Sequence, residues 1–80
     1  MIDGASILKM TDDLLRQSPD PAMIEVREQL ALMAAGRRPT KSVGSIVAKN
    51  YEHQDNPEVR QWADAAMQFW HAHSLQGSNR

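Results

Sequence analysis

Apolar residues recur along the chain at intervals of three and four, which is the spacing of one face of an α-helix. Proline, glycine and clustered polar residues interrupt this pattern at three places. No stretch alternates between apolar and polar residues with period two, so the sequence gives no support for a β-sheet. The pattern predicts an all-α protein, a compact bundle of four short helices at about residues 4–17, 21–35, 41–53 and 57–75.

Each predicted helix is preceded by a residue type that favours a helix start. Such a side chain accepts a hydrogen bond from a backbone N–H that has no partner within the helix. The second and fourth helices also have proline at their first position, which suits a helix start. Gly36 follows the second helix, where a positive φ costs glycine little. The expected capping residues are Asp3, Asp20, Thr40 or Ser42, and Asp55 or Asn56.

The chain has 80 residues, which suits a single helical domain over residues 1–76 with a frayed tail at 77–80. The fourth helix places its large residues in one wedge, so we expect it to anchor the core. His73 lies in this wedge and is interpreted as a structural histidine. The members of the wedge are Val59, Trp62, Ala66, Phe69, Trp70 and His73.

Cysteine is absent, so neither disulfides nor a cysteine nucleophile can form. No apolar run approaches the roughly 20 residues needed to cross a bilayer. We therefore expect a soluble, cytoplasmic protein with no membrane partner. His71 and His73 are two residues apart and would point in different directions on a helix, so they cannot share a metal ion. No nucleophile, base and orienting acid come together, and we expect neither an enzyme nor a cofactor, metal or small-molecule substrate.

The second helix is apolar on two sides. One side carries the stripe that would face the core, and only Glu25, Glu28 and Gln29 are expected to be solvated. The opposite apolar side indicates an interface with a protein partner or in a homodimer, unless this helix is simply the most buried one. The core stripe is Met23, Val26, Leu30, Met33 and Ala34, and the opposite side is Ile24, Ala31, Leu32 and Ala35.

A basic segment follows this helix. The net charge of the chain is −1, yet residues 29–51 hold four bases and no acid. Such a patch can attract phosphate or an acidic protein surface, although cations near helix ends also arise by chance, because they offset the helix dipole. The four bases are Arg37, Arg38, Lys41 and Lys49.

Two functions remain open on these observations. The first is a non-enzymatic protein-binding module, such as an adaptor, an inhibitor or a regulatory subunit. The alternative is a DNA-binding regulator of helix-turn-helix type, which would use the second and third helices. Against it, the connection between them is long, and the outward side of the third helix lacks residues for paired base contacts. The protein-binding residues would be Ile24, Leu32, Ala35, Arg37 and Arg38, and the nucleic-acid-binding residues Arg37, Arg38, Lys41, Ser45 and Lys49.

Overall fold

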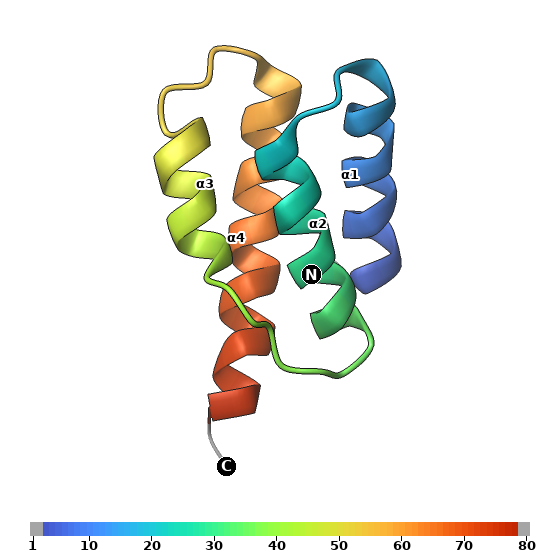
Figure 1. Ribbon diagram of the computed structural model, residues 1–80, viewed down its shortest axis with the longest axis vertical. Coiled ribbons are helices and arrows are strands. Elements are labelled where there is room, and N and C mark those ends of the chain that lie inside the picture. The colour runs from blue at the N-terminus through green and yellow to red at the C-terminus, as the bar shows by residue number, and fades with distance from the viewer. Residues whose placement is uncertain (1–2, 79–80) are drawn as a thin grey trace.

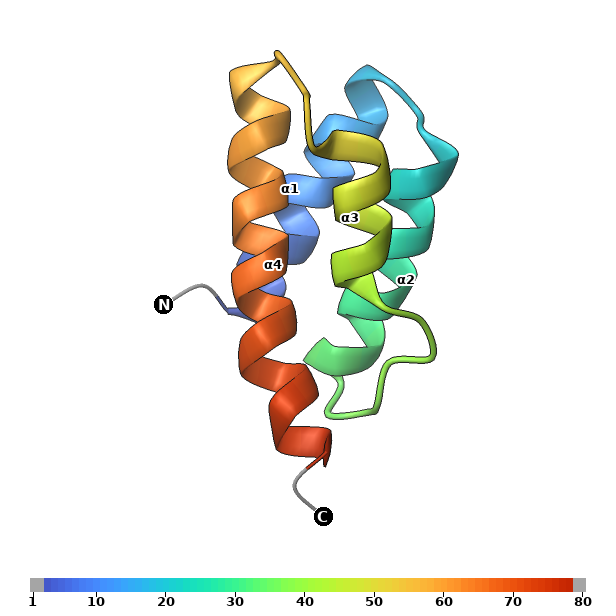
Figure 2. The same ribbon diagram turned by 90° about the vertical axis from the view of Figure 1, so that its left-hand side faces the viewer.

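The computed structural model describes residues 3–78 and confirms the predicted all-α class, with no β-strand in that range. Successive helices run in opposite directions, as Figures 1 and 2 show. Each helix packs on the next, α1 packs on α4, and α2 also contacts α4 across the bundle. The helices are α1 (Gly4–Gln17), α2 (Pro21–Ala34), α3 (Val43–Tyr51) and α4 (Pro57–Ser78).

The helix starts follow local capping chemistry. The Asp3 carboxylate accepts a hydrogen bond from the Ser6 N–H (2.8 Å), and Asp20 accepts from the Ala22 N–H (3.1 Å). At the fourth start, Asn56 Oδ1 accepts from the Glu58 N–H (2.9 Å). These bonds satisfy donors that have no acceptor within the helix.

The third helix is shorter than the sequence pattern indicates. Ser42, rather than Thr40, is its cap and accepts from the Ser45 N–H (3.1 Å), so Lys41 lies in the preceding connection. At its other end the helix stops at Tyr51 and does not reach residue 53.

The last helix is longer than expected and continues to Ser78. Residues 79 and 80 of the predicted tail lie outside the described residues. None of the helices within residues 3–78 is long and apolar enough to span a membrane.

The fourth helix forms the centre of the core, as predicted. Trp62 and Phe69 are at most 2% exposed. The Trp62 Nε1–H donates to Thr11 Oγ1 (2.7 Å), whose own hydroxyl donates to the Ile7 carbonyl (2.7 Å). The ring of His73 lies 4.0 Å from that of Phe69, between centroids, in keeping with a structural role. Every polar side-chain atom buried in the described part of the bundle thus has a hydrogen-bond partner.

The first two helices come into close contact where α1 begins and α2 ends. A Cβ atom on Gly4 would lie 2.7 Å from the Cβ of Ala34, which is closer than van der Waals contact allows. Glycine is therefore needed at this crossing because any side chain would push the two helices apart.

Candidate functional site

The second helix presents apolar side chains both to the core and to the surface. Ile24 is 47% exposed, the highest exposure of a large hydrophobic residue among residues 3–74. Leu32 is half-buried and Ala35 is exposed, so all three apolar residues predicted for the binding surface remain accessible. The core stripe is buried except at its end, where Ala34 is exposed; its buried members are Met23, Val26, Leu30 and Met33.

Gln29 is buried, although the sequence pattern predicts that it is solvated. It is 2% exposed, because its side chain turns toward the connection between α2 and α3. Its Oε1 accepts from the backbone N–H groups of Thr40 (2.7 Å) and Lys41 (3.0 Å), and its Nε2 donates to Thr40 Oγ1 (3.1 Å). One buried amide thus fixes the end of the connection that carries the basic residues.

Glycine fixes the other end of this connection. Gly36 has a φ of 78°, as its position after the second helix predicts, and its N–H donates to the Met33 carbonyl (3.0 Å). The next N–H, of Arg37, donates to the Leu32 carbonyl (2.9 Å). This pair of bonds is the Schellman arrangement of a helix end. It holds Arg37 close to Leu32.

An open hollow of about 460 Å³ lies on the outer side of α2. Along the chain its three apolar residues, Ala31, Leu32 and Ala35, come between the charged Arg27 and Glu28 and the charged Arg37. We call this hollow together with the exposed Ile24 the α2 outer surface. The lining of the hollow is Arg27, Glu28, Gln29, Ala31, Leu32, Ala35, Arg37 and Thr40.

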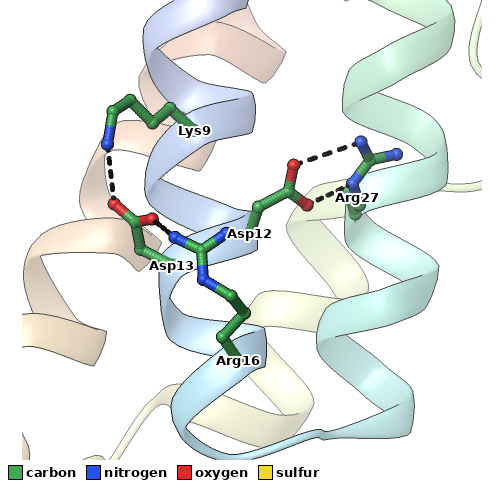
Figure 3. Close-up of polar contacts among 5 residues, drawn as sticks. All are labelled: Lys9, Asp12, Asp13, Arg16 and Arg27. Atoms are coloured by element: carbon green, nitrogen blue, oxygen red, sulfur yellow. Dashed lines mark hydrogen bonds and ion pairs between the residues drawn. The ribbon is translucent and has the colours of Figure 1, made fainter.

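Arg27 is the one cation of this lining that is already paired, and Figure 3 shows it pointing from α2 toward Asp12 of α1. Its Nε donates to Asp12 Oδ1 (2.6 Å) and its Nη2 to Oδ2 (3.3 Å). The hydrogen bond from Arg27 lowers the pKa of the Asp12 carboxyl below its ordinary value. Within α1, residues four apart face each other, and this spacing predicts pairs of Lys9 with Asp13 and of Asp12 with Arg16. The first pair is present (3.2 Å). The second prediction is wrong, because Arg16 pairs with Asp13 (Figure 3).

The structure divides the predicted basic segment. Lys41 Nζ donates to Glu25 Oε2 (2.6 Å), and this hydrogen bond raises the pKa of Lys41. Ser45 and Lys49 line a different groove, between α2 and α3, and Glu25 lies in that groove as well. A carboxylate therefore stands among three of the residues predicted to contact phosphate.

Arg37 and Arg38 lie apart from that groove. Both are exposed, and neither makes an ion pair with any residue that the structure describes. Arg37 lines the hollow on α2 together with Leu32 and Ala35, whereas Ile24 and Arg38, the other two residues of the protein-binding prediction, do not line it.

The relation between α2 and α3 differs from that in a helix-turn-helix. The two helices lie side by side and run in opposite directions (Figures 1 and 2), whereas the helices of that motif cross at about 90–120° after a turn of three or four residues. Here the connection runs from Ala35 to Ser42.

The remaining polar side chains form no metal site in the described part of the chain, and they include the pair of Tyr51 and Asp20. In the range 3–78, no three histidine, aspartate or glutamate side chains lie close enough together to hold a metal ion. At the end of the bundle where α2 begins, the Tyr51 hydroxyl donates to Asp20 Oδ2 (2.6 Å). Burial raises the pKa of Tyr51, and the hydrogen bond to Asp20 raises it further. The two groups satisfy each other beside the cap of α2, which indicates a structural role.

Comparisons of the chain with protein-family models, with curated proteins and with solved structures found no significant match.

Proposed function

We propose that this protein is a non-enzymatic binding module that docks another protein on the α2 outer surface. The accessible apolar residues on the outer side of α2, Ile24, Ala31, Leu32 and Ala35, carry the proposal, because an apolar patch on a surface, more than a single exposed side chain, marks a site that another molecule can cover. Burying the exposed part of one isoleucine contributes about 1 kcal/mol to binding. Leu32 and Ala35 extend the apolar area, and Arg37 adds a charged group at its edge.

The arrangement of this surface matches that of ordinary protein interfaces. Their centre is depleted in charge, whereas charged and polar groups gather at the rim. On α2 the small side chains of Ala31 and Ala35 flank Leu32, with Glu28 before them and Arg37 after them along the chain. A partner helix could approach closely over the two alanines, because small residues at a crossing shorten the distance between helix axes.

DNA binding through helices two and three is the weaker candidate. The Glu25 carboxylate would face the phosphates from within the groove that holds Ser45 and Lys49. Affinity for a random DNA duplex at low salt that falls steeply as salt rises would revive this alternative.

A capture experiment with matched variants tests the proposed function. Wild-type protein, Ala35→Arg and Ala72→Arg are immobilised separately and exposed to lysate of the source cells. Both alanines are exposed, but only Ala35 lines the hollow. We expect wild type and Ala72→Arg to retain the same proteins and Ala35→Arg to lose them. The proposal would be contradicted if all three baits retained the same proteins, or if wild type retained nothing, not even a second copy of this chain.

A further inference from the structure

We propose that the partner on the α2 outer surface is a second copy of this chain, with the two α2 helices antiparallel. The proposal rests on the proposed function, since it names the occupant of the same surface. Two ion pairs would hold the copies together, each between Glu28 of one copy and Arg37 of the other.

The hollow on α2 contains one acid and one base that have no ion-pair partner among the described residues. Glu28 and Arg37 both line it and are both exposed. Neither makes an ion pair with another described residue, whereas the nearby Arg27 is held by Asp12. The hollow therefore offers one unpaired acid and one unpaired base, separated along the chain by its apolar residues.

The acid and the base are placed before and after Leu32. Glu28 lies one helical turn before Leu32, which is about 6 Å along the axis. Arg37 lies beyond Leu32 in the other direction, held there by its N–H bond to the Leu32 carbonyl. Glu28 and Arg37 thus lie on opposite sides of Leu32 along α2.

A surface with this pattern is complementary to itself. In a twofold dimer the same patch meets its own copy, so residue i contacts residue j and j contacts i. A twofold axis near Leu32, perpendicular to α2, places Glu28 of each copy opposite Arg37 of the other. Ala31 and Ala35 would then meet across the axis, where their small side chains allow the backbones to approach.

Other occupants fit the charges less well. A uniformly acidic segment would pair with Arg37 but would place a carboxylate against Glu28, and a basic segment would have the reverse fault. Like charges facing each other across an interface disfavour binding. A second copy satisfies both charges.

Charge reversal followed by sedimentation equilibrium tests the proposal. The variants are Glu28→Arg, Arg37→Glu and the double variant that carries both. Each single reversal places two like charges together, so we expect the dimer dissociation constant to rise at least about tenfold. The double variant restores opposite charges with the signs exchanged, and its dissociation constant should return to within about threefold of wild type.

Matched controls separate this local effect from net charge. Asp64→Arg and Arg60→Glu change the net charge by the same amounts at exposed positions of α4, so they should leave dimerisation unchanged. Circular dichroism should show the same helix content for every variant.

Three results would overturn the proposal: a monomer up to millimolar concentration, a dimer that neither reversal weakens, or a double variant that remains as weak as the singles. A monomer whose hollow still captures another protein selectively would remove the second copy and leave the proposed function standing. A monomer that captures nothing would remove both.

Discussion

Gln29 provides the sharpest test of how the connection after α2 is held. Methionine has a similar length and flexibility, so Gln29→Met keeps most of the packing while removing the hydrogen bonds to Thr40 and Lys41. We expect the fold to persist, with a less stable connection.

The size of the effect follows from the bonds that are lost. Two backbone N–H groups share the Gln29 oxygen at 2.7 and 3.0 Å, and the amide nitrogen makes a third bond at 3.1 Å. A net value of about 1 kcal/mol for each bond gives about 3 kcal/mol. Thr40 and Lys41 are exposed, so water can replace part of this, and the expected loss in the free energy of unfolding is about 2 kcal/mol.

Urea unfolding followed by tryptophan fluorescence measures this loss. Amide hydrogen exchange should show faster exchange at Thr40 and Lys41, by about 30-fold for 2 kcal/mol of lost local stability. Gln68→Met, at an exposed position of α4, is the control and should change little. A loss below about 0.5 kcal/mol together with unchanged exchange at both amides would contradict this expectation.

Three further predictions concern the core and the caps. Thr11→Val should lower the free energy of unfolding by about 1–3 kcal/mol because the buried Trp62 N–H loses its acceptor. Thr11→Ser keeps the acceptor and loses only a buried methyl group, worth about 0.8 kcal/mol, so a loss for Thr11→Val no larger than that for Thr11→Ser would contradict this. In the same urea assay Gly44→Ala should stabilise the fold by about 0.5–1 kcal/mol, because alanine favours a helix and the added methyl group meets its nearest neighbour at 3.4 Å. Gly4→Ala should destabilise the fold, because its added methyl group would lie 2.7 Å from the Cβ of Ala34. Changes of the same sign in the two variants would contradict these expectations. The fold raises the pKa of Tyr51 above its ordinary value of 10.0, so stability should be fully present below that pH and fall as pH rises above it. Tyr51→Phe should remove this loss of stability at alkaline pH. The chain has one tyrosine, so the absorbance of tyrosinate reports its titration directly. An ordinary pKa for Tyr51 would contradict the prediction.

The helix starts could be predicted from sequence because capping is local. Asp3, Asp20 and Asn56 each bond an N–H two or three residues further on, so sequence spacing alone identifies them. The end of α2 could also be predicted from the sequence, because Gly36 has a positive φ and glycine is the residue type that such a φ favours.

Contacts between distant parts of the chain could not be found in this way. The bond from Arg27 to Asp12 depends on how α1 packs against α2, and helical spacing within α1 instead favours Arg16. Gln29 lies three residues after Val26 and four before Met33, a spacing that places it on the core stripe. Its polarity suggested solvent, because the backbone groups that satisfy it come from a connection whose path the sequence does not reveal.

The candidate surface was predictable in its apolar part and not in its charges. Ile24 and Leu32 follow from helical periodicity on the outer side of α2. Glu28 is exposed, as the sequence predicts, but its place in one hollow with Arg37 depends on the turn at Gly36. A run of bases in sequence does not make one patch, because this turn sends neighbouring residues to different grooves.

The two anchors of the connection after α2 also affect how fast and how tightly anything can dock there. Gly36 at one end and Gln29 at the other hold the backbone around Arg37 before any encounter, so little loop entropy is lost on association. Docking on this face should therefore resemble the meeting of two rigid bodies, with little backbone movement between the unbound and bound shapes.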